Sequence, residues 1–577
     1  MVAVSFLPRR PTVTLAVLAT LIVSGCGGGT AGAERPSAVP TPTRSPTASP
    51  SAGPDPAAQA AELVRTLSDE DLVGQVLMPY AYGSSATKVS AGSAAGNRAL
   101  AGVDTPAEII AKYRLGGLIL VGFSADDPTG GNQETTNVDS PKQVRDLTTG
   151  LQTAAAKLAA GKVPMLIGTD QEYGVVTRIK TGVTQLPSGM AFGAAGDPAL
   201  TERAWQAAGT ELAALGLNVD FAPDADVLGA HSEVIGSRSY GADPKAVAAQ
   251  VAGAVRGLQG AGVAATLKHF PGHGHTTGDS HAELPVLGQD RAALDSGDLP
   301  PFTGGIAAGA WLVMSGHLDT RAIDPGTPAT FSHKVLTDLL RNQLGFTGVI
   351  VTDGMNMAPA KRWPAGEAAV RALNAGNDLL LMPPNIGQAY DGVLAALRDG
   401  SLPRARLVDA VTRVLTLKFR LAGRTAPPMS TLASKPHQEA ARKVAAAAVT
   451  QLRGDCGGPL VRGAVTVTAS GGRDRTRALL SDALRAAGVK VVASGGTVVH
   501  LVGYGDGASD LRSDAAVTVG MDTPDLLAKA NSKVLLATYS STAAAMSALA
   551  DVLAGRAAAP GHAPVPVAGL PATSCGG

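Results

Sequence analysis

Residues 268–281 read KHFPGHGHTTGDSH and concentrate side chains that can do chemistry. The segment holds four of the ten histidines in the chain, together with Asp279. Imidazole binds metals and also exchanges protons near neutral pH. Three functions therefore compete for this segment: a metal centre, an acid/base loop, and a structural turn whose histidines hydrogen-bond backbone groups.

A metal centre has suitable ligands in this segment. Imidazole and carboxylate groups suit zinc, and the segment offers five of them: His269, His273, His275, Asp279 and His281. The helical HExxH spacing is absent, however, glycine and proline break the segment, and the chain contains no CxxC pair. We therefore expect no metal and no cofactor.

The other two functions, an acid/base loop and a structural turn, are assigned to different histidines. We expect His273 and His275 to hydrogen-bond loop carbonyls. Asp279 and His281 are two residues apart, so in an extended or tightly turned segment their side chains point the same way. The carboxylate then orients the imidazole and favours its protonated form, which makes His281 a proton donor. The glycines of the loop allow it to move over a bound substrate.

A partner for this acid/base lies downstream, in GVIVTDGMNM at residues 348–357. Asp353 follows an apolar run and precedes Gly354, and a carboxylate in such a loop can act as a nucleophile. Retaining hydrolysis of a glycoside needs one group that attacks the anomeric carbon and one that passes protons. Asp353 and His281 supply that pair.

The elements that position these residues alternate between short apolar runs and longer helical stretches. The runs are nearly continuous in apolar residues, as in strands buried on both faces. They lie at 73–80, 116–123, 164–170, 217–224, 263–270, 310–317, 348–355 and 378–384. Helices are predicted at 197–216 and 243–262, each beginning at Asp-Pro and ending on glycine. This α/β pattern predicts a (β/α)₈ TIM-type barrel, with an open doubly wound sheet as the alternative.

Polar residues lie at the ends of five of the eight runs. Active sites of such barrels lie at the carboxyl ends of the strands. We therefore expect a shared mouth that contains Asp170, Glu172, Asp224, Lys268, His269, His317 and Asp353.

Three segments together resemble the family 3 glycoside hydrolases, and most closely their β-N-acetylglucosaminidase branch. They are KHFPGHGHTTGDSH at 268–281, TDQEYG at 169–174 and VTDGMNM at 351–357. The resemblance covers residues 63–421. It implies Asp353 as the nucleophile, His281 as the acid/base and Asp279 as its partner. It also implies a (β/α)₈ barrel with a smaller C-terminal α/β sandwich domain.

The resemblance further implies a set of sugar-binding residues: Asp170, Arg178, Arg238, Lys268 and His269. The sequence departs from the family pattern in three ways. Tyr173 stands where a small residue is usual and is expected either to narrow the mouth or to alter the tolerance for groups on the sugar. His275 replaces a common acidic residue, and the segment after Met357 is short.

The N-terminus has the features of an export signal. Arg9 and Arg10 precede an apolar run at 13–23, which leads to VSGC ending at Cys26. This resembles a lipobox and predicts a signal peptide at 1–25, lipidation of Cys26 and an anchor on the outer face of the cell membrane. An ordinary signal with an incidental cysteine is the alternative. Residues 26–58 are rich in Pro, Ser and Thr and are expected to form a disordered tether.

The rest of the chain divides into three predicted parts: a catalytic barrel at 59–424, a linker and helix at 425–445, and an α/β domain at 446–577. HQEAARKVAAAAVTQLR at 437–453 is predicted as a helix. Cys456 and Cys575 are predicted to form a disulfide across the last domain, as in exported proteins.

The formal net charge of +1 argues against a nucleic-acid partner. The leading function is an exported, retaining exo-β-N-acetylglucosaminidase that removes terminal GlcNAc from muropeptide fragments of the cell wall. The alternatives are a phosphorylase of the same substrates and a sugar-binding lipoprotein without activity. The sequence does not fix the oligomeric state.

Overall fold

The computed structural model describes residues 55–122, 135–229, 232 and 234–575. The predicted signal peptide, Cys26 and most of the tether lie outside these residues. Helix α1 begins at Pro56 and is capped by Asp55, so the last residues predicted as tether are helical. Within the described ranges, we find no helix with the length and apolarity needed to cross a bilayer.

Eight parallel strands form the barrel, one from each predicted apolar run. They are β1 (Leu77–Met78), β2 (Gly117–Ile119), β3 (Leu166–Thr169), β6 (Val219–Asp220), β7 (Ala264–Phe270), β9 (Leu312–Ser315), β11 (Val349–Thr352) and β12 (Leu380–Leu381). Six of them make a sheet in the order β11-β9-β7-β6-β3-β2, and β12 pairs with β1.

Two backbone contacts close this sheet into a ring. Val351 pairs with Leu379 in parallel, which joins β11 to β12. The N–H of Ile119 donates to the carbonyl of Pro79 at 3.0 Å, which joins β2 to the end of β1. The prediction of a (β/α)₈ barrel is therefore confirmed, and the open sheet is excluded.

The interior of the ring is an apolar core. Side chains from successive strands, including Ile119, Phe221 and Leu312, form one buried cluster. Helix α13 (Arg404–Leu421) contributes Val414 and Leu417 to it. Side chains therefore fill the barrel, which is a packed core and not a pore.

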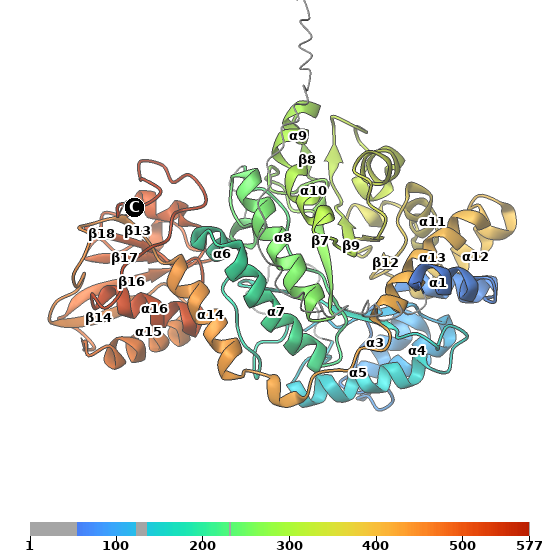
Figure 1. The fold of residues 1–577 in the computed structure, drawn as a ribbon, viewed down its shortest axis with the longest axis horizontal. Coiled ribbons are helices and arrows are strands. Elements are labelled where there is room, and N and C mark those ends of the chain that lie inside the picture. Colours follow the sequence, from blue (N-terminus) through green and yellow to red (C-terminus); the bar gives the residue numbers. More distant parts are fainter. Residues whose placement is uncertain (1–54, 123–134, 230–231, 233, 576–577) are drawn as a thin grey trace, which may run out of the picture. The chain divides into compact units, whose positions relative to one another are not determined.

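Helices surround the barrel strands. Helices α7 (Pro198–Ala214) and α8 (Pro244–Gly260) lie side by side (Figure 1). Asp197 and Asp243 accept hydrogen bonds from the first N–H groups of these helices. The others are α2 (Asp69–Gln75), α3 (Ala91–Ala101), α4 (Pro106–Tyr113), α5 (Pro141–Ala155), α6 (Gly189–Ala195), α9 (Arg291–Gly297), α10 (Leu299–Ala307), α11 (Ala365–Ala375), α12 (Ile386–Asp399) and the π-helix η3 (Lys334–Gln343). Short pairs also form, β4 (Gln171–Tyr173) with β5 (Val176–Thr177) and β8 (Val286–Leu287) with β10 (Asp319–Thr320).

The C-terminal domain contains a second six-stranded sheet in the order β13-β18-β17-β16-β14-β15. Its strands are β13 (Thr450–Arg453), β14 (Ala464–Ala469), β15 (Lys490–Val491), β16 (Thr497–Val502), β17 (Val517–Gly520) and β18 (Val534–Ala537). Helices α15 (Asp474–Ala486) and α16 (Ala543–Leu553) pack on one face through a shared apolar cluster (Figure 1). The predicted α/β sandwich is thus present.

The helix predicted at 437–453 is too long. Helix α14 covers Lys435–Ala448, and Thr450–Arg453 instead form β13, the antiparallel edge of the sheet beside β18. Thr450, Gln451 and Leu452 are buried there, and Thr450 and Gln451 pair with Ala537 and Leu536 of β18. That tertiary gain outweighs a weak local helix preference.

A disulfide joins Cys456 to Cys575, with Cα atoms 5.5 Å apart and a sequence separation of 119. It fastens the end of the chain to the segment that follows β13.

Candidate active site

The predicted site residues gather at the carboxyl ends of neighbouring barrel strands. Asp170 directly follows β3, and Lys268 and His269 lie near the end of β7. Asp224, beyond β6, pairs with Lys268 through the backbone, and Asp353 directly follows β11. The ring of strands therefore brings together residues that are far apart in the sequence.

The carboxylate of Glu172 pairs with two positively charged side chains, Arg238 and Lys268, at the floor of this mouth. It accepts from Arg238 Nε at 2.7 Å and from Arg238 Nη2 at 3.1 Å. Lys268 Nζ also contacts the same carboxylate. Burial by itself would raise the pKa of Glu172, but Arg238 and Lys268 outweigh that effect and lower it. Glu172 is therefore an ionised carboxylate that orients both cations.

Asp170 extends this cluster toward solvent. Lys268 Nζ lies 3.2 Å from Asp170 Oδ1, and Arg178 Nη2 lies 3.7 Å from Asp170 Oδ2. The side chain of Asp170 is 18% exposed, whereas those of Lys268 and Arg178 are 3% and 2% exposed. Asp170 is thus the member of the cluster best able to meet a ligand.

His269 is fixed by a carboxylate that the sequence analysis missed. Asp226 accepts from the His269 backbone N–H at 3.1 Å and lies 2.7 Å from His269 Nδ1. The Nε2 atom then faces Arg238 Nη2 at 3.4 Å. Burial, followed by the charge of Arg238, lowers the pKa of His269 to about 4, so its ring is neutral at pH 7. A neutral ring with Nδ1–H bound to Asp226 leaves Nε2 as an acceptor.

The site also contains a group of metal-type ligands. One ligand atom each from Asp224, Asp226 and His269 lies within 4.8 Å of the others. The guanidinium of Arg238 already lies 3.6 Å from Asp224 Oδ2 and 3.4 Å from His269 Nε2. A positive charge from the protein therefore stands where a cation would bind, and the donor set fits arginine better than a metal.

The histidines of the loop are held differently from our prediction. His273 contacts Thr276 Oγ1 at 2.7 Å and Ser280 Oγ at 3.1 Å, and His275 Nδ1 lies 2.8 Å from Asp298 Oδ1. The predicted bonds to loop carbonyls are wrong. Those carbonyls are already used by backbone N–H groups, as between His273 and Thr276.

Asp353 is ionised at the end of β11. Its Oδ1 accepts from the Gly354 N–H at 2.7 Å, and His317 contacts the Gly354 carbonyl at 3.0 Å. Burial would raise the pKa of Asp353, but nearby histidines, led by His269 and including His317 and His281, lower it to about 2. The group is therefore a carboxylate throughout the neutral range, as a nucleophile must be.

Asp279 and His281 form a pair on the loop. Asp279 Oδ1 accepts the His281 backbone N–H at 2.8 Å and lies 2.7 Å from His281 Nδ1. The side chains are 37% and 17% exposed, so both are open to a ligand. Because Nδ1 is bound to the carboxylate, Nε2 is the ring atom that can exchange a proton.

The loop also contacts the segment that follows Asp353. The carbonyl of His281 accepts a hydrogen bond from the N–H of Ala358 at 3.4 Å. The imidazole of His281 is near enough to lower the pKa of Asp353. The loop that bears His281 therefore lies against the segment that follows Asp353.

Comparison with known proteins identifies the family. Residues 71–417 match the Glycosyl hydrolase family 3 N terminal domain, which is more than half of the chain. The chain belongs to glycosyl hydrolase family 3.

Named relatives agree with this membership in the family. A beta-hexosaminidase A of Pseudoalteromonas piscicida is 34% identical over 380 residues, which are 60% of this chain and 61% of that protein. The chain therefore spans about three fifths of that relative's length. A beta-hexosaminidase of Stenotrophomonas maltophilia is 40% identical over 286 residues, which are 48% of this chain and 82% of that protein.

A solved structure matches the family 3 chain beyond the barrel. The glycoside hydrolase family 3 beta-N-acetylglucosaminidase from a Paenibacillus species has a TM-score of 0.75 and 33% identity. The match covers 87% of this chain and 99% of that one.

Tyr173 does not narrow the mouth of this family 3 barrel, contrary to our expectation. Its side chain is buried, at 2% exposure, and its ring meets that of Trp205 edge to face at 5.7 Å. Trp205 lies on α7. The larger side chain therefore fills the layer between barrel and helices instead of facing a ligand.

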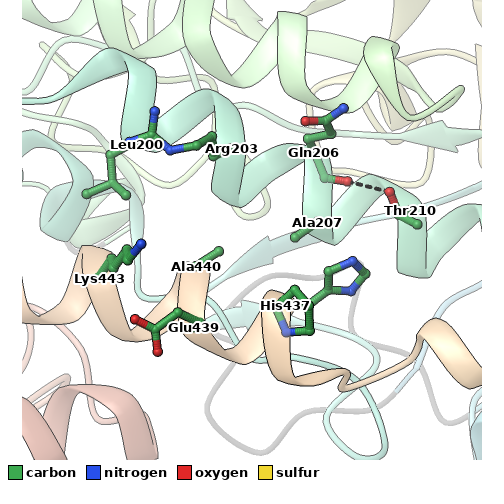
Figure 2. A pocket seen from close by; sticks show the side chains of 10 residues that line it. Leu200, Arg203, Gln206, Ala207, Thr210, His437, Glu439, Ala440 and Lys443 are labelled. Carbon is green, nitrogen blue, oxygen red and sulfur yellow. Dashed lines mark hydrogen bonds between the residues drawn. The ribbon is translucent and has the colours of Figure 1, made fainter.

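A separate cavity of about 300 Å³ lies between α7 and α14 (Figure 2). Arg203, Gln206, His437, Glu439 and Lys443 are among its lining residues. None of the residues at the strand ends lines this cavity. We assign it no part in the chemistry of the family 3 site.

Proposed function

We propose that this chain is a retaining exo-β-N-acetylglucosaminidase that removes terminal β-linked GlcNAc from muropeptide-type fragments of the cell wall. The observation that carries the proposal is the hydrogen bond that joins the loop of the Asp279–His281 pair to the segment directly after the ionised Asp353. The names of the relatives, beta-hexosaminidase and beta-N-acetylglucosaminidase, support the choice of sugar.

The first half of the reaction forms a glycosyl-enzyme. A carboxylate oxygen of Asp353 attacks the anomeric carbon while the bond from that carbon to the leaving oxygen breaks. His281 Nε2–H gives its proton to that oxygen, so the aglycone departs as an alcohol. Asp279 holds the ring through Nδ1, which leaves Nε2 to make the transfer.

The second half returns the enzyme to its starting state. His281, now neutral, takes a proton from water as the water oxygen attacks the anomeric carbon. The bond to Asp353 breaks, and GlcNAc leaves with its β-configuration retained. Both roles of His281 use the same ring atom, so the loop does not have to change position between the two steps.

The buried cluster orients the sugar during both steps. Asp170 is the exposed acceptor for a sugar hydroxyl, and Lys268 and Arg178 fix its position. Arg238 and His269 stand beside this cluster, where His269 Nε2 can accept a hydrogen bond from a further hydroxyl. Such fixed contacts hold the anomeric carbon against the nucleophile, which is the main benefit of positioning.

The test is turnover of a chromogenic β-N-acetylglucosaminide. We expect activity in the wild type and a loss of about 10³-fold or more in Asp353→Ala, since the covalent step is removed. His281→Ala should lose about 10²-fold or more, whereas His333→Ala, at an exposed histidine, is the matched control and should be unchanged. A wild type without turnover under any condition contradicts the proposal and favours a sugar-binding protein.

A fluorosugar probe locates the nucleophile. Intact-protein and peptide mass spectrometry after reaction with a 5-fluoro glycosyl fluoride should find the adduct on Asp353. An adduct on another carboxylate overturns the assignment of roles. The same assay with added phosphate separates hydrolase from phosphorylase, because sugar 1-phosphate instead of free sugar indicates transfer to phosphate.

We also propose export and lipidation at Cys26, which the sequence VSGC supports. Labelling cells with an alkyne fatty acid should mark the wild type and leave Cys26→Ala unmarked. A membrane-fraction protein without label contradicts the lipid anchor.

A further inference from the structure

The turn that carries Arg238 is supported from outside the barrel. Arg238 ends the 3₁₀ turn η1 (Gly236–Arg238), and its neighbour Ser237 is buried. The hydroxyl of Ser237 donates to the carboxylate of Asp522, which follows β17 of the C-terminal domain. A side chain of the second domain therefore binds the residue directly before Arg238.

Further contacts from the same domain cover this turn. Thr523 Cγ2 lies 3.7 Å from the position that a Cβ on Gly236 would take. Val234 and Ile235 pack in one apolar cluster with residues of the C-terminal domain, including Tyr539. The carbonyl of Pro564 accepts the N–H of Ala242 at 2.9 Å. The segment that bears Arg238 is thus held on its outer side by the second domain.

The inner side of the same segment faces the reacting mouth. The Arg238 guanidinium meets Glu172 at 2.7 Å and His269 at 3.4 Å. These contacts depend on the backbone of the η1 turn, because a buried side chain cannot compensate for a shift of its own Cα by choosing another rotamer freely. The bond from Ser237 to Asp522 limits such a shift.

We propose that Asp522 is a positioning residue for catalysis: through Ser237 it fixes Arg238, so that the C-terminal domain sets how tightly the barrel binds the sugar. The inference rests on the proposed function, in which Arg238 helps to hold the substrate. Asp522 itself does not touch the sugar. Its effect is transmitted over one peptide unit.

If Asp522 only stabilised the contact between the two domains, the expected result would be different. Loss of a purely stabilising contact lowers the melting temperature and the fraction of active enzyme, and it leaves KM unchanged for the molecules that remain folded. Loss of positioning raises KM while the melting temperature and the fraction labelled by the fluorosugar probe stay near their wild-type values.

The experiment measures KM, kcat and melting temperature on the full chain. Asp522→Ala and Ser237→Ala should each raise KM about tenfold, the effect of losing one hydrogen bond to a charged group. The double variant should be no worse than either single one, since both remove the same bond. Asp522→Asn keeps an oxygen acceptor and should stay within about threefold of the wild type. Asp525→Ala removes the same charge three residues further on, in η7 (Pro524–Lys529), and serves as the control, with KM unchanged.

Unchanged KM in Ser237→Ala and Asp522→Ala, with an active wild type, overturns the inference and leaves the proposed function intact. A wild type that turns over no N-acetylglucosaminide rejects the proposed function, and the inference with it. If Asp522→Ala does not fold, Ser237→Ala decides, because it removes the bond from the barrel side and leaves the second domain unaltered.

Discussion

Replacing Glu172 with Gln tests the charge cluster at the floor of the mouth. The change keeps the size of the side chain and removes the negative charge that Arg238 and Lys268 share. The three side chains are only 3–4% exposed, so water screens the interaction little. Removing one partner of a buried ion pair destabilises a protein by about 3–5 kcal/mol. Because Asp170 remains beside Lys268, we expect the lower end, about 3 kcal/mol.

The pH dependence gives this prediction a second measure. The pKa of Glu172 is lower in the folded than in the unfolded chain. The contribution of Glu172 to the free energy of unfolding is therefore complete above the pKa of the unfolded chain, and it is lost as the pH falls through the pKa of the folded chain. Urea unfolding should show wild type and Glu172→Gln differing by about 3 kcal/mol near pH 7, and by less near pH 3. A difference below about 1 kcal/mol at neutral pH, or one that does not change with pH, refutes the reasoning.

Three further predictions follow from other parts of the molecule. Lys418 is buried with only Gln75 Oε1 at 2.7 Å, and burial lowers its pKa to about 7. Lys418→Met should therefore be more stable than wild type by about 2 kcal/mol near pH 6, and this advantage should vanish toward pH 10 in urea unfolding. A variant less stable than wild type at pH 6 contradicts it. Asp279→Asn should lower kcat about tenfold to hundredfold with little change in KM, because the amide no longer fixes the orientation and tautomer of the His281 ring. An unchanged kcat would argue against the pair. Serine at both Cys456 and Cys575 should lower the free energy of unfolding by about 2–5 kcal/mol, given their sequence separation of 119, and an unmoved urea midpoint would count against this.

The fold was predictable because its signals are local. Each barrel strand is a short run of apolar residues, and polar side chains at strand ends share an edge wherever parallel strands close. The Asp279–His281 pair was predictable for the same reason, since its members are two residues apart and one carboxylate oxygen serves both the backbone and the ring.

Contacts between distant residues left no such signal. Glu172 and Arg238 are 66 residues apart, and Asp226 lies 43 residues before His269. A lone carboxylate near a strand end is usually a cap or a solvated group, so its partner cannot be chosen without the topology. The partners of His273 and His275 were misjudged because the loop's backbone N–H groups, which compete for the same carbonyls, were not counted.

The error at residues 449–453 has a related cause. An alanine-rich stretch favours a helix over its whole length when only local preference is considered. The antiparallel edge beside β18 requires a partner strand, and that requirement comes from residues 534–537, far along the chain. Val449 and Thr450, both β-branched, were the available hint of a strand.

The hydrogen bond from the Ala358 N–H to the His281 carbonyl joins the loop that follows β7 to the loop that follows β11. An insertion or deletion between Gly354 and Ala358 would therefore tilt the proton donor as well as the attacking carboxylate. Engineers who transplant either segment into another barrel will need to move both together.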